Sequence, residues 1–263
     1  MLQKRFIPTL SFVMILLSML ACNLGQSISS GNPSETGSSD SSTGNSTGDA
    51  SAGSSACANS LYPVKAGATW TYQFSDSTLG GFTRSITSVS ADGFNDQDVF
   101  TKGTTRTGEW KCNAGTLTAL QPDSGPTASV QNASVQADFK TTSMDGVTIP
   151  ATVKAGDTWS QNFVLEGTET IHSLQVKAKN VTALSCTAGA SESVTVKAGT
   201  FNAVHMDCKT DATITITMNG TDVPTPVSWT STSWYAPAVG LVKTDSLLNN
   251  THITMELTAY HIP

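Results

Sequence analysis

The chain has 263 residues, only 13% of them charged, and a formal net charge of −6. Binding to nucleic acid needs clustered Lys and Arg to neutralise phosphates, and the basic residues here are isolated along the chain, so we expect no nucleic-acid partner. With so few charges, solubility depends on Thr, Ser and Asn, a composition that suits β-sheets with a hydroxyl-covered outer face.

The first 21 residues have the order of an export signal, with Lys4 and Arg5 before an apolar run from Phe6 to Leu20. A bilayer-spanning helix needs about 20 consecutive apolar residues, so a permanent transmembrane segment is the weaker alternative. We therefore predict a signal peptide at residues 1–21. Its removal takes Lys4 and Arg5 away, which lowers the 14 basic residues to 12 against 20 acidic ones.

The residues around Cys22 extend this prediction. Met19-Leu20-Ala21-Cys22 resembles the lipobox of bacterial lipoproteins, although Leu is usual where Met19 stands. The resemblance implies a diacylglyceryl group on Cys22 and cleavage just before it, whereas an accidental cysteine beside an ordinary cleavage site is the alternative. Two or more acyl chains anchor a protein stably, so we expect an extracytoplasmic protein whose N-terminal lipid holds it to the cell membrane or the outer membrane.

Residues 22–56 form the predicted linker. From Gly25 to Ala56 the chain is rich in Ser, Gly, Thr, Asn and Asp, with almost no apolar residue to bury, which predicts a flexible coil. A plain spacer and a glycosylated or wall-spanning stalk both fit this composition.

Four cysteines follow the linker: Cys57, Cys112, Cys186 and Cys208. An even number in an exported domain indicates two disulfides, and three pairings are possible. We favour Cys57 with Cys112 and Cys186 with Cys208, because the second pair flanks a predicted hairpin. Four free buried thiols are the alternative.

Residues 57–263 are predicted to be all-β, with antiparallel sheets arranged as a sandwich or a half-open barrel. The region contains many stretches of four to eight residues in which polar and apolar side chains alternate. Each stretch is bounded by Gly, Asn, Asp or Pro, and no helical periodicity is evident. The clearest strand is 213–218, followed by Asn219-Gly220, which suits a two-residue hairpin turn. Further strands are expected at 227–235, 241–248 and 253–260, and a hairpin around Asp92-Gly93.

A short phrase recurs in this region. Val64-Lys-Ala-Gly-Ala-Thr-Trp70 is repeated at Val153-Lys-Ala-Gly-Asp-Thr-Trp159, and more loosely at Val196-Lys-Ala-Gly-Thr-Phe201. We interpret each copy as a tight Gly turn that begins a strand with a large aromatic residue. The first two copies suggest two β-halves, 57–148 and 149–263, although one large β-domain fits the length equally well.

Three motifs carry a resemblance to a family. Tyr62-Pro-Val-Lys-Ala-Gly-Ala-Thr-Trp-Thr-Tyr72, the Val196–Phe201 phrase and Trp234-Tyr-Ala-Pro-Ala-Val-Gly-Leu-Val242 occur in that order. Together they resemble an uncharacterised family of bacterial exported proteins and lipoproteins with G-x-x-W-x-Y, V-x-A-G-T-F and W-Y-A-P-x-V-G-x-V motifs. The resemblance implies an antiparallel β-fold, for which a curved half-barrel is one form, and supplies no catalytic residues.

Few residues point to chemistry. The histidines, His172, His205, His252 and His261, form no metal-binding pair, and strand alternation places His205 and His252 on the wet face. No G-x-S-x-G elbow is present. We therefore predict no catalytic residue, no metal site and no cofactor.

Asp92, Asn95, Asp96 and Asp98 cluster in one segment. Oxygen ligands in this number make a surface Ca²⁺ site conceivable, but their spacing fits no known calcium loop. We expect a solvated hairpin tip instead.

Of the five tryptophans, Trp229 and Trp234 are the candidate binding residues, and core packing is the expectation for the rest. They are five residues apart, so on a regular strand they project from opposite faces and at least one is expected to be exposed.

These features predict a non-enzymatic, membrane-anchored β-module that binds an envelope or extracellular ligand or supports the envelope. A lipid or lipopeptide carrier with an apolar concave sheet is the first alternative, and a secreted hydrolase the second. The sequence leaves open the ligand, the oligomeric state and which membrane receives the anchor.

Overall fold

The computed structural model describes residues 55–120, 129–131, 135–171, 174–248 and 250–263. The predicted signal peptide, Cys22, almost all of the linker and His172 lie outside the described residues. Within the ranges given above, no helix is both long and apolar enough to cross a membrane.

The described part of the chain is all-β, which confirms the predicted fold class. Apart from one 3-10 turn, η1 (Ser55–Cys57), its regular elements are antiparallel strands. The strands are β1 (Thr69–Phe74), β2 (Gly81–Val89), β3 (Gly93–Phe100), β4 (Thr105–Asn113), β5 (Thr116–Ala119), β6 (Ser129–Gln131), β7 (Val135–Gly146), β8 (Thr158–Ile171), β9 (Leu174–Val196), β10 (Gly199–Met218), β11 (Thr221–Ala236), β12 (Gly240–Leu248) and β13 (Thr251–His261).

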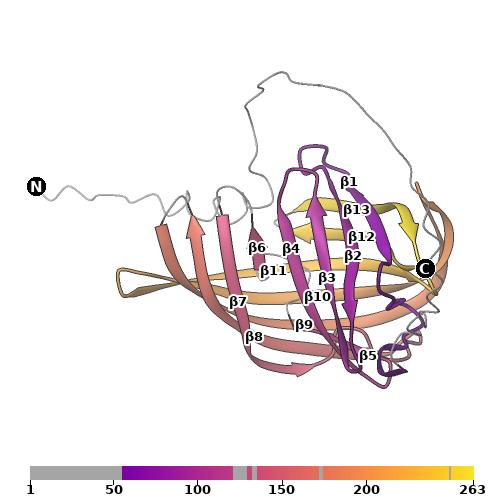
Figure 1. The fold of residues 1–263 in the computed structure, drawn as a ribbon, viewed down its shortest axis with the longest axis horizontal. Helices are drawn as coiled ribbons and strands as arrows, with labels where there is room; N and C mark the ends of the chain where they lie inside the picture. The colour runs from indigo at the N-terminus through magenta and orange to yellow at the C-terminus, as the bar shows by residue number, and fades with distance from the viewer. Residues whose placement is uncertain (1–54, 121–128, 132–134, 172–173, 249) are drawn as a thin grey trace, which may run out of the picture. The chain divides into compact units, whose positions relative to one another are not determined.

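All of these strands belong to one sheet. Its order is β3-β2-β1-β13-β12-β11-β10-β9-β8-β7-β6-β4-β5, and β3 also pairs with β4, so the strands follow one another around a nearly closed ring (Figure 1). Among the described residues, the narrowest seam is at β6, where two residues pair with β7. Of the two predicted arrangements, the sheet is barrel-like and not a sandwich, and the expected halves 57–148 and 149–263 are parts of the same sheet.

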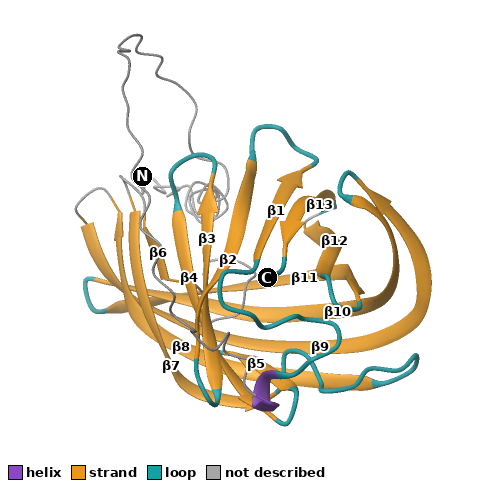
Figure 2. Ribbon diagram, turned by 45° about the vertical axis from the view of Figure 1, so that its right-hand side comes forward, coloured by secondary structure: helices purple, strands orange, loops and turns teal. Residues whose placement is uncertain are grey.

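The long strands β7–β11 sweep around one side of this sheet and bend strongly, whereas β1–β5 are shorter (Figure 2). Most connections are tight hairpins. Asn219 and Gly220 have φ values of 51° and 77° and join β10 to β11, as expected for a two-residue turn that requires positive φ at both positions. The same freedom is used at Gly67 and Gly156, which precede β1 and β8 in the repeated phrase.

The main hydrophobic core lies between β1–β5 and the ends of the long strands. Aromatic rings dominate it: Phe94 stacks on Trp110 with ring centroids 5.2 Å apart, and Tyr62 lies 5.5 Å from Trp110. Two core rings are bonded to the backbone: Trp70 Nε1 donates to the Val239 carbonyl, and the Tyr72 hydroxyl donates to that of Leu241.

A second, smaller cluster is formed by three consecutive strands, β7, β8 and β9. Its buried members share one face of the sheet and are Ala137, Phe139, Phe163, Leu165 and Ala178.

Two disulfides join Cys57 to Cys112 and Cys186 to Cys208, the pairing that the sequence favoured. The first connects the start of the domain to β4. The second links residues directly opposite each other on β9 and β10 and therefore braces the middle of the sheet.

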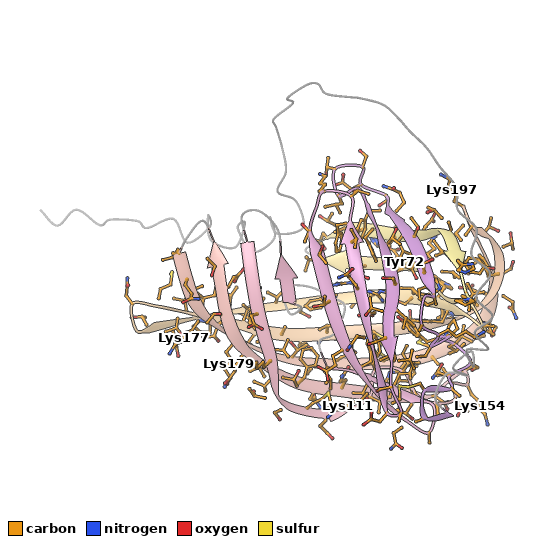
Figure 3. The ribbon with its side chains drawn as sticks, in the orientation of Figure 1. Tyr72, Lys111, Lys154, Lys177, Lys179 and Lys197 are labelled. Atoms are coloured by element: carbon orange, nitrogen blue, oxygen red, sulfur yellow. A yellow bond between two sulfur atoms is a disulfide. The ribbon has the colours of Figure 1, made fainter. Side chains whose placement is uncertain are left out.

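Side chains on β9 alternate between two faces of the sheet. Val176 and Ala178 are buried on the face that we call the inner face, whereas Lys177 and Lys179 project into solvent on the outer face (Figure 3). Residues that are paired across neighbouring strands point to the same face, so the inner and outer faces continue over β8 and β10.

Candidate functional site

A groove of about 840 Å³ crosses strands β8 to β13. We call it the outer groove, because most of its lining side chains belong to the outer face by strand alternation. The lining residues are Thr158, Trp159, Ser160, Ser185, Cys186, Thr187, Asp207, Cys208, Lys209, Thr230, Ser231, Thr232, Asp245, Leu247 and His252.

Strand register explains why these residues meet. Ser160 of β8 is opposite Ser185 of β9, which is opposite Lys209 of β10, and this row continues to Thr230 of β11. A second row lies two residues away on each strand. It joins Thr158, Thr187, Asp207 and Thr232. The row between them carries the Cys186–Cys208 disulfide, so the floor of the groove is covalently braced.

Hydroxyl groups dominate the groove, and its charged side chains are tied to neighbours. Thr232 donates to Asp207 Oδ1 at 2.6 Å. Lys209 Nζ lies 2.8 Å from Asp211 Oδ2, just beyond the groove. Hydrogen bonds from Lys209 and Ser228 lower the pKa of Asp211 below its ordinary value. The groove therefore presents donors and acceptors in fixed positions.

At one edge of the outer groove, His252 Nδ1 lies 3.1 Å from Asp245 Oδ1. An Asp–His pair of this kind orients a general base in hydrolases. Among the residues that the structure describes, no hydroxyl is hydrogen-bonded to the other ring nitrogen of His252, whose side chain is 65% exposed.

Trp234 lies two residues beyond Thr232 on the same face of β11, at the end of the groove. Its Nε1 donates to Glu192 Oε1 at 2.5 Å, and Lys243 Nζ sits 5.6 Å from its ring centre. Trp229 belongs to the opposite face by alternation and pairs in register with Thr210, a buried residue of β10. Both indoles are half-buried.

The remaining tryptophans are packed to different degrees. Trp70 and Trp110 are buried in the main core, as expected. Trp159 is half-buried and donates from Nε1 to the Thr148 carbonyl at 3.1 Å.

His205 lies beside the groove and close to two carboxylates. Its ring nitrogens are 3.7 Å from Glu192 Oε1 and 3.6 Å from Asp207 Oδ2. The ring rests against Gly189, where a Cβ would come within 1.7 Å of it. His261 is exposed at the end of β13.

The predicted solvated tip at residues 92–98 is correct for Asp92 and Asn95 and wrong for Asp96 and Asp98. The latter two are 4% and 2% exposed, because strand β3 turns them to the inner face. Within the described ranges, no group of three or more His, Cys, Asp or Glu is arranged to hold a metal ion.

Asp98 is the centre of a buried ionic network that the sequence analysis missed. Arg84 of β2 binds both of its oxygens, at 2.8 and 2.9 Å, and Arg106 of β4 binds from the other side. Burial alone would raise the pKa of Asp98, but the two guanidinium groups outweigh it and lower the pKa to about 2. Asp96 accepts a hydrogen bond from Trp110 Nε1 at 3.0 Å.

A second set of buried polar groups lies on the inner face of β8 and β9, without such partners. Asn180 and Thr182 are 1% and 4% exposed, and among the described residues neither the amide atoms nor the hydroxyl has a hydrogen-bond partner. Glu169 is 4% exposed, and burial raises its pKa above the ordinary value. In the sequence, the sign of this set was that polar residues occupy positions of an alternating strand at which apolar residues are expected.

Comparison with known proteins identifies the chain's relatives. One similar solved structure is a Bacteroides fragilis protein described as exported, with a YmcC-like fold; it is 15% identical, has a TM-score of 0.48, and the match covers 78% of this chain and 100% of that one. A Parabacteroides distasonis protein described as a lipoprotein is 17% identical with the same TM-score, over 77% and 99% of the two chains. No curated protein is similar enough to be matched.

A family model matches residues 90–256. This range includes two of the three motifs quoted above, at 196–201 and 234–242, and begins after the first. Because the match spans more than half of the sequence, the chain belongs to the DUF3108-like family.

Proposed function

We propose that this protein is a membrane-anchored, extracytoplasmic binding module without catalytic activity, and that the outer groove binds a hydroxyl-rich ligand such as a glycan of the cell envelope. The observation that carries the proposal is the groove itself. Hydroxyls and well-spaced carboxylates line it over the six adjacent strands β8 to β13, on a floor braced by the Cys186–Cys208 disulfide.

The location rests on two features. The N-terminal sequence, with Lys4, Arg5 and Cys22, has the order of a lipoprotein export signal. Both disulfides fit an oxidising compartment outside the cytoplasm.

The ligand class follows from the chemistry of the groove. Serine and threonine hydroxyls both donate and accept hydrogen bonds, which matches the hydroxyls of a sugar. Asp207 and Asp245 add strong acceptors, and the indole of Trp234 lies at the groove end, where an aromatic ring can pack on the apolar face of a sugar. Seven lining residues are Ser or Thr, whereas Leu247 is the one Leu, Ile or Val side chain of the lining.

A binding role explains the charged groups better than an acid–base role. Asp207 is held by Thr232, and Asp245 by His252. The Asp245–His252 pair is the feature that favours hydrolysis as a second candidate function. A hydrolase of this type also needs a nucleophile in contact with the free nitrogen of His252.

The test is sedimentation of the detergent-solubilised full-length protein with purified peptidoglycan sacculi. Ser185→Trp fills the middle of the groove, and we expect it to weaken binding at least about tenfold, because a bulky ring displaces a ligand from a hydroxyl-lined floor. Lys177→Trp is the matched control, on the outer face of the same strand but outside the groove (Figure 3). Equal binding of the two variants, or no binding by the parent protein, would contradict the proposal.

The same preparation separates binding from hydrolysis. Released sugar or peptide fragments are measured with the parent protein and with His252→Ala. We expect no fragments from either, and fragments that disappear in the His252 variant would establish the hydrolase.

A further inference from the structure

We infer that the inner face of β8–β10 is a second binding site, which takes an acyl chain that carries a neutral amide group. Asn180 and Thr182 hydrogen-bond to the amide, and the apolar side chains around them hold the alkyl chain. This site lies on the opposite face of the sheet from the outer groove and does not depend on the function proposed for that groove.

The first step is the position of the two polar residues. Asn180 and Thr182 are two residues apart on β9, so their side chains leave the same face about 6.6 Å from each other. Lys179 projects the other way, to the outer face (Figure 3). Both polar side chains are more than nine-tenths buried.

The second step is their surroundings, which are apolar. Asn180 is opposite Leu165 of β8 and Ile214 of β10. Thr182 is opposite Phe163 and Ala212 on the same two strands. All four of these neighbours are buried.

The third step is that the hydrogen-bonding capacity of the pair is unused. The amide nitrogen and oxygen of Asn180 and the hydroxyl of Thr182 have no hydrogen-bond partner in the part of the chain that the structure describes. Buried polar groups without partners are rare in folded proteins, and each one calls for a specific explanation. Leucine and valine would fill the same positions without that penalty.

A buried amide elsewhere on the inner face shows how this sheet satisfies a structural polar group. Gln161 of β8 is fully buried, donates to the Ala119 carbonyl at 2.9 Å and accepts from the Thr148 hydroxyl at 2.8 Å. Asn180 is therefore an exception on its own face, as expected of a group that meets a ligand.

The chemistry of the pair selects the ligand. Asn180 offers both a donor and an acceptor, and a secondary amide, with its N–H and C=O, is complementary to both at once. The neighbours Phe163, Leu165 and Ile214 suit an alkyl chain. Lys and Arg are missing from the inner-face positions of β8–β10 between 163 and 182 and between 212 and 216, so an anionic headgroup has no cation to meet there.

The experiment measures binding of two probes to the full-length protein held in amphipol, so that no detergent competes. N-methyl dodecanamide offers a donor and an acceptor, and methyl dodecanoate has the same chain length without the donor. We expect the parent protein to bind the amide about three- to tenfold more tightly than the ester, which is what one neutral hydrogen bond provides.

Asn180→Leu should remove this preference by weakening the amide alone, and Thr182→Val should reduce it by a smaller factor. Asn162→Leu, an exposed position on the outer face of β8, is the matched control and should bind both probes as the parent does. Unfolding midpoints are recorded for every variant. A midpoint for Asn180→Leu at or above that of the parent shows that lost binding is not lost folding.

The inference is overturned if the parent protein binds neither probe, if it binds both equally, or if Asn180→Leu retains the amide preference. Ser185→Trp, which fills the outer groove, should leave both affinities unchanged. A parallel loss in that variant would show that the probes bind in the outer groove and would equally overturn the inner-face site.

Discussion

Two regions of the same sheet bury polar side chains on the inner face, and they differ in how those groups are satisfied. On β2–β4, Asp98 is bound by Arg84 and Arg106. On β9, Asn180 and Thr182 are equally buried, but no described residue hydrogen-bonds to their side chains. The first arrangement holds three strands together. The second leaves hydrogen-bond donors and acceptors free for a ligand.

The comparison teaches that burial of polar groups has two meanings in this sheet. A partnered network contributes to the folded state, because removing one member leaves charges buried without compensation. An unpartnered group costs stability and persists only if another role requires it. The two readings predict opposite signs when a polar group is replaced, which makes the comparison testable.

The largest effect is expected for Asp98→Asn. The substitution keeps the shape of the side chain but leaves two buried guanidinium groups without a counter-charge, so we expect the free energy of unfolding to fall by about 3–5 kcal/mol. Urea denaturation measures it. Asp92→Asn, in the exposed turn before β3, is the control and should stay within about 0.5 kcal/mol of the parent. Equal midpoints for the two variants would show that the network contributes nothing.

The same carboxylate predicts a loss of stability in acid. The pKa of Asp98 is lowered from 3.8 to about 2 in the folded protein, so its contribution is present above pH 4 and disappears as the pH falls from about 4 to 2. Unfolding followed between pH 5 and pH 2 should show this decline in the parent. In Asp98→Asn the decline should be weaker over that window, and an identical slope in both proteins would refute the assignment.

A smaller loss is expected for Gln161→Met. Methionine matches the length of the side chain but leaves the Ala119 carbonyl without its donor in a fully buried position. We expect a fall of about 1–3 kcal/mol in the free energy of unfolding. A variant that is as stable as the parent would mean that the inner face tolerates unsatisfied polar groups generally, and Asn180 would then no longer be an exception.

The strands and hairpins could be predicted from the sequence because their signals are local. Alternation over 213–218 and the Asn219-Gly220 pair lie within a few residues of each other, and they locate the turn of the β10–β11 hairpin. The strands themselves are longer than expected, since β10 begins at Gly199 and β11 at Thr221. The spacing of the cysteines around a second hairpin likewise favoured the pairing of Cys186 with Cys208.

The closure of the sheet and the outer groove could not be predicted in the same way. Closure of the sheet depends on the pairing of β1 with β13, whose residues are about 190 positions apart in sequence. The row from Ser160 to Thr230 depends on the combined register of four strands. The alternation of polar and apolar residues along a strand assigns each side chain to a face of the sheet. It does not show which residues of neighbouring strands lie in the same row. The prediction of a solvated tip failed at Asp98 because its two arginine partners come from different strands. By strand alternation, however, Asp98 shares a face with Phe94 and Phe100, and this was a sign in the sequence that it could be buried.

For the buried polar groups without partners on β9, we expect a change of the opposite sign, so Thr182→Val should increase the free energy of unfolding. Valine has nearly the same shape, and removing an unsatisfied buried hydroxyl is expected to raise the free energy of unfolding of the ligand-free protein by up to about 1 kcal/mol. Thr187→Val, exposed on the outer face of the same strand, is the control and should change it little. A destabilised Thr182 variant would show that its hydroxyl has a structural partner after all.

The smallest effect is expected for Glu169→Gln, and it depends on pH. Burial raises the pKa of Glu169 in the folded protein above 4.5, and among the described residues no ion pair or hydrogen bond reaches its carboxylate. A raised pKa means that folding favours the protonated acid, so the contribution of Glu169 to stability is greatest below pH 4.5 and is lost as the pH rises through the folded-state pKa. Glutamine carries no charge at any pH and removes this decline. The variant should therefore match the parent near pH 4 and exceed it at pH 7, as measured by urea denaturation at both values. A variant that is less stable at pH 7 would mean that the ionised carboxylate has a stabilising partner, and the β8–β9 region would then belong with the satisfied network on β2–β4.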